Sequence, residues 1–367
     1  MNAPLSTFAP DPALASWPFL TPSPIRLGTP PEIAILDQTA LPHMARWLSI
    51  NDLAAAVQAI ARMQVRGAPL IGIVAACGVA LAMFADPGDA ALDAAVQRLA
   101  ATRPTAVNLQ WALNRMRAKL QPLPPVERAE AAWREARALY QEDAQMTASL
   151  GLAGLNLLRD LADKTSRPLS LMTHCNAGWL ATSANGTALA PIYAAHAAGL
   201  PVVVRVSETR PRAQGWLTAW ELHKAGVPHS LFADNAAGFL LAQGQVDAVI
   251  VGADRIAANG DVANKVGTLL KALAARRFGV PFYVAAPSST FDAGAASGAD
   301  FVIETRAADE LRRVQGRNAQ GEIDEIILFA ADELVDNPAF DVTFADLITG
   351  FISERGVFAS AQAAFVS

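Results

Sequence analysis

The chain between Ile50 and about Gly151 carries its apolar residues at a spacing of three or four, which predicts a mostly helical region. Asn51 is expected to cap the first helix, over LAAAVQAIARM. Further helices are predicted over APLIGIVAACGVALAMF, TAVNLQWALNRMRAKL and PVERAEAAWREARALYQEDAQ. Pro69 and Pro104 stand where the second and third helices begin, a position that proline favours. Ahead of this region, IAILDQTALP is typical of a strand and turn.

Beyond about residue 151 the pattern changes to short, continuous apolar runs. LSLMT, PVVVRV, HSLFA, DAVIVG, PFYVAA, DFVIE and EIILFA resemble buried strands, and segments such as ALAPIYAAHAAG and VGTLLKALAARRFG are helical. This alternation predicts a parallel sheet that is covered on both faces. The predicted fold class is therefore α/β, with a doubly wound, mostly parallel, Rossmann-like domain over 151–367 after a smaller, mostly helical domain over 1–150.

Composition and charge narrow the class of protein. Hydrophobic residues make up 52% of the 367 residues and charged residues 17%, which excludes a disordered chain. The net charge is −5 and no Lys/Arg-rich run occurs, which argues against nucleic acid and anionic membranes as partners. The uncharged stretch 67–85 is near membrane-spanning length. It is rich in Gly and Ala and lacks a cation after it, which favours a buried helix.

The cysteines indicate a reducing compartment. Cys77 and Cys175 are far apart, and no basic residue precedes Arg26 as a secretory signal would require. We therefore expect free thiols and a cytoplasmic location. Neither cysteine has a zinc-like partner spacing, and no Gly-rich phosphate loop of the nucleotide-binding types occurs. The sequence therefore indicates neither a metal nor a nucleotide cofactor.

Polar residues follow five successive predicted strands. Because ligands in doubly wound sheets bind beyond the carboxyl ends of the strands, these segments together predict an active site. The five segments are His174–Gly178, Ser207–Arg212, Asp234–Gly238, Ala253–Arg255 and Pro287–Thr290.

The stretch VGADRIAANGDVANKVG carries a cation near an expected helix start. Asp261 is expected to cap a helix beginning at Val262, which would place Lys265 in the first turn. A cation there is unfavourable by roughly 0.3 to 1 kcal/mol, unless an anion binds the free amides beside it. Arg66 and Arg103 also precede predicted helices, which favours a phosphate-sized anion. The alternative is that these are solvated cations at helix ends.

Two strand-end residues have the chemistry of catalytic groups. Asp254 follows a very apolar strand, where a desolvated carboxyl group can act as a general acid. The alternative for Asp254 is an ion pair with the adjacent Arg255. Cys175 is either a reactive thiol or a small buried hydrophobe, which is the interpretation that Cys77 receives. His174 is next to Cys175, but neighbours in an extended chain point in opposite directions, so we do not pair them.

Several motifs together resemble one family. VRGAPLIG, RPTAVNLQWALNRM, THCNAGWLAT, ETRPRAQGWLTAWEL, VGADRIAANGDVANKVGT, PFYVAAPSSTFD and NPAFDVTFADLITGFISERGV are similar to segments of methylthioribose-1-phosphate isomerases of methionine salvage. The resemblance runs in the same order from about Leu36 to Val357. Related branches are ribose-1,5-bisphosphate isomerases, 5-deoxyribose-1-phosphate isomerases and regulatory subunits of a translation-initiation nucleotide exchange factor.

The resemblance implies a homodimeric isomerase that converts 5-methylthioribose 1-phosphate to 5-methylthioribulose 1-phosphate without cofactor or metal. It implies that Asp254 is the proton donor and Cys175 the second catalytic group. The implied substrate contacts, some of them from the helical domain, are Arg66, Gly67, Ala68, Arg103, Gln214, Asn264 and Lys265. Hydrogen could pass from C2 to C1 as a proton, through an enediol and Cys175, or directly as a hydride.

The chain departs from the family pattern at three places. Trp179 stands where a small residue is usual, Ser207 stands where an acidic residue is commoner, and GWLTAWEL is one residue shorter than usual. These departures bear on the substituent at C5 of the sugar. 5-Deoxyribose 1-phosphate and ribose 1,5-bisphosphate are therefore alternative substrates. A non-catalytic regulatory protein on the same scaffold is the alternative from another functional class.

Overall fold

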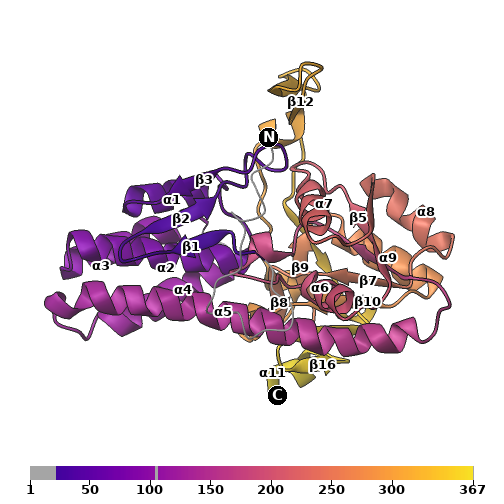
Figure 1. Ribbon diagram of the computed structural model, residues 1–367, viewed down its shortest axis with the longest axis horizontal. Coiled ribbons are helices and arrows are strands. Elements are labelled where there is room, and N and C mark those ends of the chain that lie inside the picture. Colours follow the sequence, from indigo (N-terminus) through magenta and orange to yellow (C-terminus); the bar gives the residue numbers. More distant parts are fainter. Residues whose placement is uncertain (1–21, 104–105, 367) are drawn as a thin grey trace. The chain divides into compact units, whose positions relative to one another are not determined.

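The computed structural model describes residues 22–103 and 106–366, which form two compact units (Figure 1). Unit 1 contains the described residues up to Ser149 together with Gly178–Ala190. Unit 2 contains Leu150–Ala177 and the described residues from Pro191 onward. The long helix α5 (Pro125–Ala162) passes from unit 1 into unit 2. The prediction that helical structure gives way to strands near residue 151 was therefore wrong by about three helical turns.

Unit 1 is built around the buried helix α2. Its elements are the antiparallel strands β1 (Ile25–Leu27), β2 (Ile33–Leu36) and β3 (Trp47–Ser49), and the helices α1 (Leu53–Ala61), α2 (Ala68–Ala85), α3 (Asp89–Ala100) and α4 (Val107–Leu120). Helix α2 packs against α1, α3 and α4. Every residue from Leu70 to Met83 is buried, which confirms the predicted buried helix. Within the described ranges, α2 is the one helix long and apolar enough to cross a membrane.

Two details of the unit 1 helices differ from the sequence prediction. The cap of α1 is Asp52 and not Asn51, since the Asp52 carboxylate accepts from the Ala55 amide at 2.7 Å. A capping side chain accepts from the backbone amide two or three residues after it. Asp52 lies three residues before Ala55, whereas Asn51 lies one residue too early. Pro69 lies at the start of α2 as predicted. Pro104 lies outside the described residues, and α4 begins at Val107.

Unit 2 contains a seven-stranded sheet in the order β16-β15-β10-β7-β4-β5-β6. All neighbours run parallel except β16, which is antiparallel to β15. Numbered along the chain, the parallel strands stand in the order 3-2-1-4-5-6 of a Rossmann-like doubly wound sheet, which confirms the predicted fold class. The strands are β4 (Leu169–Thr173), β5 (Val202–Ser207), β6 (His229–Phe232), β7 (Ala248–Val251), β10 (Phe282–Ala285), β15 (Gly350–Ser353) and β16 (Gly356–Phe358).

Helices cover both faces of this sheet. Adjacent strand residues point to opposite faces, and Phe351 and Ile352 of β15 illustrate the two environments. Phe351 belongs to the apolar cluster that includes Ala272 of α9. On the other face, a Cβ built on Gly154 of α5 would lie 3.5 Å from Ile352 Cγ2. The unit 2 helices are the end of α5, α6 (Ala190–Ala197), α7 (Gln214–Lys224), α8 (Ala237–Ala242), α9 (Thr268–Phe278), α10 (Asp309–Arg312) and α11 (Ala361–Val366).

Two of the seven predicted strands are not part of the large sheet. DFVIE forms no strand, and its Val302 is 77% exposed. EIILFA contributes to β13 (Ile323–Ile327), which pairs only with β12 (Arg313–Arg317) in a two-stranded hairpin. Ile326 is 60% exposed there. An apolar run alone does not distinguish a buried strand from an exposed one, because burial depends on what packs against it.

A second sheet has four strands, and the first of these along the chain follows β7. It consists of β11 (Phe291–Asp292), β8 (Arg255–Ala257), β9 (Val262–Lys265) and β14 (Phe340–Thr343), in that order. Strand β9 pairs antiparallel with both β8 and β14. The prediction of a helix beginning at Val262 was therefore wrong. Asp261 does not cap a helix at Val262, and its carboxylate instead accepts from the amides of Gly298 and Ala345, which begin two short 3-10 helices.

Candidate active site

Two polar loops lie where the strand order of the large sheet reverses. Cys175 follows β4 and Asp254 follows β7, and these two strands are hydrogen-bonded neighbours. The chain continues from β4 to β5 on one side, whereas β10 lies on the far side of β7. Ligands of doubly wound sheets bind in the crevice at this switch point. The structure therefore brings the two predicted catalytic residues, both half-buried, to the same place on the sheet edge.

The backbone of Cys175 is held in an unusual conformation. Its φ is 65°, and the φ of Thr209 is 64°, which is strained for a β-branched residue. The Cys175 amide donates to Thr209 Oγ1 at 2.8 Å, and the Cys175 carbonyl accepts from Thr218 Oγ1 at 2.8 Å. Such strain costs about 1 to 3 kcal/mol per residue and persists only where the surroundings impose it. A rigid loop therefore presents the free Cys175 thiol.

Asp234 holds the neighbouring loop after β5, a role that the sequence did not assign to it. Its carboxylate accepts from the Ser207 hydroxyl and, at 2.8 Å each, from the amides of Thr209 and Arg210. Burial opposes its ionisation, but these hydrogen bonds outweigh burial and lower the pKa of Asp234. The sequence did contain an indication of this role, because Asp234 follows the strand β6 and therefore lies at the same sheet edge as the other polar loops.

The neighbour of Asp254 has a partner of its own. Arg255 Nε donates to Asp292 Oδ2 at 2.6 Å, and the guanidinium lies 5.1 Å from the centre of the Phe301 ring. The charge of Arg255 is therefore engaged by Asp292.

Gln214 is the first residue of α7 and has an unsatisfied acceptor. The residue is 6% exposed, and its Oε1 is buried with no hydrogen-bond partner among the described residues. A buried amide oxygen without a partner costs about 1 to 3 kcal/mol. Such a group is able to accept a hydrogen bond from a ligand hydroxyl, which agrees with the binding role that the resemblance implies for it.

Asn264 and Lys265 lie at the end of β9 rather than in a helix. Asn264 is buried and donates to Thr268 Oγ1 at 3.1 Å. Lys265 Nζ donates to the Ala339 carbonyl at 2.8 Å and lies 4.4 Å from the centre of the Phe340 ring. The expectation that Lys265 stands in a first helical turn was wrong, because the helix begins three residues later.

The amino terminus of α9 already has an anion. The Asp341 carboxylate accepts from the Gly267 amide at 2.6 Å and from the Leu269 amide at 3.2 Å. Asp341 comes from β14, which pairs with β9. The sequence could not indicate this cap because the carboxylate lies more than 70 residues further along the chain.

Four of the implied substrate contacts lie in unit 1, namely Arg66, Gly67, Ala68 and Arg103. Gly67 precedes α2 with a φ of 95°, and a Cβ there would lie 2.5 Å from three atoms of Ala181. Only glycine fits this backbone and this space. Arg66 Nε donates to Gln38 Oε1 at 3.1 Å, and Arg103 is half-buried.

Two buried basic side chains of unit 2 were given no role from the sequence, and Lys271 was not singled out at all. His174 Nε2 lies 2.8 Å from the Val266 carbonyl, so this nitrogen carries the proton. Burial, together with the positive charge of Lys271, lowers the pKa of His174 to about 3, which keeps the imidazole neutral. Lys271 is 1% exposed on α9. The sequence did contain an indication that Lys271 is buried, because it stands at helical spacing from the buried Thr268, Ala272 and Ala275.

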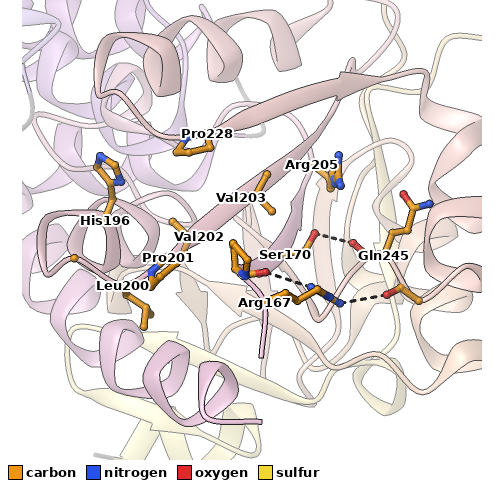
Figure 2. A pocket seen from close by; sticks show the side chains of 13 residues that line it. Arg167, Ser170, His196, Leu200, Pro201, Val202, Val203, Arg205, Pro228 and Gln245 are labelled. Carbon is orange, nitrogen blue, oxygen red and sulfur yellow. Dashed lines mark hydrogen bonds between the residues drawn. The ribbon is translucent and has the colours of Figure 1, made fainter. Parts of the chain in front are cut away.

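A cavity of about 760 Å³ opens at the opposite, amino-terminal edge of the sheet (Figure 2). Residues that precede the strands line it, including Arg167, Pro228 and Gln245. Arg167 donates two hydrogen bonds to Asp247, at 2.8 and 2.9 Å, and the Ser170 hydroxyl donates to the Gln245 carbonyl at 2.6 Å. These groups are satisfied within the unit, and the cavity lies away from the strand ends that carry the reactive side chains. Across the described part of the chain, no group of three or more His, Cys, Asp or Glu is placed to hold a metal ion.

The sequence matches a known family over most of its length. The model of the Initiation factor 2 subunit family matches residues 64–360. The chain is 58% identical over 325 residues to the methylthioribose-1-phosphate isomerase of Dechloromonas aromatica, covering 89% of this chain and 90% of that protein. It is 53% identical over 329 residues to the protein of the same name from Brucella anthropi, with coverage of 89% and 90%.

Solved structures with the same fold come from two functional classes. The 5-methylthioribose 1-phosphate isomerase from Pyrococcus horikoshii OT3 has a TM-score of 0.78 and 37% identity, over 92% of each chain. A translation initiation factor eIF-2B subunit delta from A. fulgidus has a TM-score of 0.77 and 36% identity, over 94% of this chain and 98% of that one.

Proposed function

The chain belongs to the Initiation factor 2 subunit family, and from this premise we propose that it is a methylthioribose-1-phosphate isomerase of methionine salvage. The proposed reaction is the intramolecular conversion of the aldose 5-methylthioribose 1-phosphate to the ketose 5-methylthioribulose 1-phosphate. The observation that carries the proposal is the pair of Cys175 and Asp254 at the switch point, in a chain 58% identical to a protein of that name.

The two residues have complementary roles in the proposed reaction. The Asp254 carboxyl group gives its proton to the ring oxygen as the bond between C1 and the ring oxygen breaks. The Cys175 thiolate takes the proton from C2, which leaves an enol between C1 and C2. Cys175 then returns this proton to C1, and the C2 hydroxyl proton passes to Asp254. Both side chains regain their starting protonation, and the product carries a carbonyl at C2.

The other residues of the site are proposed to bind the substrate. Arg66, Arg103 and Lys265 supply positive charge for the phosphate. Gly67 and Ala68, at the start of α2, are the proposed backbone contacts of the substrate. Gln214 and Asn264 are the proposed partners of sugar hydroxyls, which is supported by the unsatisfied Gln214 Oε1.

The test is turnover of 5-methylthioribose 1-phosphate, followed by phosphorus and proton NMR. Cys175→Ala and Asp254→Asn are each expected to fold and to lose about 10²- to 10⁴-fold in kcat. Cys77→Ala removes the other thiol, which is buried in α2, and Asp247→Asn removes a carboxylate at the opposite sheet edge. Both controls are expected to keep kcat. Full activity in both site variants would show that the catalytic assignment is wrong.

The fate of the C2 hydrogen separates the two transfer routes. Proton transfer through Cys175 predicts that turnover in deuterium oxide places solvent deuterium at C1 of the product. Direct hydride transfer would retain the original C2 hydrogen at C1 completely. The same NMR assay, run with 5-deoxyribose 1-phosphate and ribose 1,5-bisphosphate, gives the preference at C5. The methylthio sugar is expected to have the highest kcat/KM.

A second candidate is a non-catalytic regulatory protein. It is favoured by the 36% identity to the initiation factor subunit, over nearly the whole of both chains. It predicts binding of a sugar phosphate without turnover, and no effect of Cys175→Ala or Asp254→Asn on function. Measurable conversion of any of the three sugar phosphates excludes this candidate.

We also propose that the protein is a cytoplasmic homodimer. Phe239 of α8 and Leu270 of α9 are 64% and 65% exposed, and these two helices pack together. Exposed apolar groups on adjacent elements are typical of a contact surface. Sedimentation should give a dimer that Leu270→Glu weakens. A stable monomer of the wild-type protein at micromolar concentration would contradict the proposal.

A further inference from the structure

Glu221 of α7 is a fully buried acidic side chain that the proposed reaction does not use. It is 0% exposed, and glutamate is almost never buried to this extent unless its oxygens are hydrogen-bonded or paired. One oxygen accepts from Asn176 Nδ2 at 2.7 Å, and the other accepts from the Tyr193 hydroxyl at 2.8 Å. Glu221 therefore joins three segments of unit 2, namely α7, α6 and the loop after β4.

Asn176, the residue after Cys175, directs both of its side-chain protons to α7. Besides the bond to Glu221, its Nδ2 donates to Thr218 Oγ1 at 3.1 Å. An amide NH2 group has two donors, so the two bonds use its full capacity. Thr218 and Glu221 are three residues apart, which places them on the same face of the helix, and Thr218 is also fully buried.

This pair of acceptors is connected to the backbone of Cys175. The Thr218 hydroxyl accepts from Asn176 and donates its proton to the Cys175 carbonyl at 2.8 Å. On the other side, the Cys175 amide donates to Thr209 Oγ1 at 2.8 Å. The peptide groups before and after Cys175 are thus both held, at a φ of 65° that residues with a Cβ rarely adopt. Because the backbone angles set the direction of the Cα–Cβ bond, these contacts aim the thiol.

Tyr193 completes the chain of hydrogen bonds on the far side of Glu221. It is 4% exposed on α6, and burial, together with the charge of Glu221, raises the pKa of Tyr193. The hydroxyl therefore keeps its proton and donates it to Glu221. An apolar residue at position 221 would leave the buried Asn176 amide and Tyr193 hydroxyl without this acceptor, which is costly inside a protein.

We propose that Glu221 is a positioning residue for the thiol chemistry, because through Asn176 and Thr218 it holds Cys175 in the conformation that aims its side chain at the substrate. This inference rests on the proposed function, in which Cys175 exchanges a proton with the sugar. Glu221 itself contacts no reacting atom. Without it, the Asn176 side chain loses its anchor on α7, and Cys175 is free to relax to a negative φ that turns the thiol away.

A pair of substitutions at position 221 tests the proposal in the full-length protein. Glu221→Met removes both acceptor oxygens and retains a side chain of similar length. Glu221→Gln is the matched variant, since its Oε1 still accepts from Asn176 and its NH2 group can donate to the Tyr193 hydroxyl oxygen. The kcat and KM for 5-methylthioribose 1-phosphate are measured by the NMR assay. Circular dichroism and thermal unfolding establish that each variant is folded.

A second pair of substitutions tests the same chain of hydrogen bonds at position 218. Thr218→Val removes the hydroxyl with little change of shape, and Thr218→Ser retains it. Ser170→Ala is the control for the loss of a buried hydroxyl, because Ser170 lies on β4 and donates to the Gln245 carbonyl at 2.6 Å, at the opposite edge of the sheet. Ser170→Ala is expected to lower the melting temperature and to keep kcat.

Glu221→Met and Thr218→Val are each expected to lower kcat about 10- to 100-fold with KM nearly unchanged, since a displacement of roughly 1 Å at a reacting group costs up to about 10²-fold. Glu221→Gln and Thr218→Ser should recover most of the wild-type kcat, which a loss of stability alone would not produce. The double variant should be about as slow as the slower single variant, because both positions act through Asn176.

Folded Glu221→Met and Thr218→Val variants with the wild-type kcat would overturn the inference. Fold-decreases that multiply in the double variant would also overturn it, because the two residues would then act separately. If Glu221→Met does not fold, Thr218→Val decides the question alone. Each of these outcomes is distinct from failure of the proposed function, which is decided by turnover of the wild-type protein and of Cys175→Ala.

Discussion

Asp143 in α5 is a fully buried carboxyl group whose ionisation should be visible in the stability of the protein. Its Oδ2 accepts from the Ser183 amide and hydroxyl, each at 2.7 Å. Burial raises the pKa of Asp143 from 3.8 to about 6, although the two hydrogen bonds oppose this. These contacts hold the segment Gly178–Ala190, which follows the Cys175 loop in the chain, to α5 within unit 1.

The elevated pKa determines the sign of the effect. Between pH 4 and 6 the folded state binds a proton at Asp143 that the unfolded state has released, so the free energy of unfolding falls as the pH rises. The contribution is fully present below about pH 4 and is lost as the pH rises through about 6. The rise from 3.8 to about 6 corresponds to about 3 kcal/mol. Asp143→Asn, which stays neutral, should not lose this contribution.

Denaturant unfolding at several pH values measures the effect. The free energy of unfolding of Asp143→Asn, minus that of the wild type, is expected to increase by about 2 to 3 kcal/mol between pH 4 and pH 7. Taking the difference cancels the contributions of the other titrating groups. Asp160→Asn is the matched control, since Asp160 is exposed on the same helix. A difference for Asp143→Asn that stays constant with pH would refute the reasoning.

Substitutions at three further positions, with their controls, test the local structure of unit 2. Gly215→Ala should destabilise the fold by about 3 kcal/mol in thermal unfolding, because its Cβ would lie 1.9 Å from the Ser207 carbonyl oxygen. Gly238→Ala in α8 is the control: its Cβ would meet no atom within 4 Å, and the substitution should be neutral. Asp341→Ala should cost about 1 to 2 kcal/mol by leaving two amides of α9 without a cap, and Asp341→Asn should recover part of this in the same assay. Gln214→Leu should raise KM about tenfold, and an unchanged KM would argue against a role of Gln214 in binding. The melting temperature should not fall, because the substitution removes a buried acceptor that has no partner among the described residues.

The sequence predicted those elements whose apolar pattern reports a local environment. Helix α2 was predicted from continuous apolar content and the proline at its start, and five strands of the large sheet were predicted from β-branched runs. Cys175 and Asp254 were selected because each follows such a strand. These features depend on the preferences of neighbouring residues, which a single sequence contains.

The sequence failed where a local pattern fits two structures equally well. EIILFA looks like a buried strand, but its place in an exposed hairpin depends on what else packs against it. The segment after Asp261 contains residues that suit a helix, yet pairing with β14 makes it a strand. Tertiary pairing overrides local propensity here because each strand satisfies its backbone groups with a partner that is distant in the chain.

The amino-acid sequence by itself determined the fold class, the family and the residue types available for chemistry. The tertiary structure decided which of these residues lie close together. The order of the strands places Cys175 beside the loop that carries Asp254, and β14 brings Asp341 to the start of α9. The same packing buries Lys271 of α9. Contacts between segments dozens of residues apart depend on the shared burial of whole sheet faces, which no local window of sequence contains.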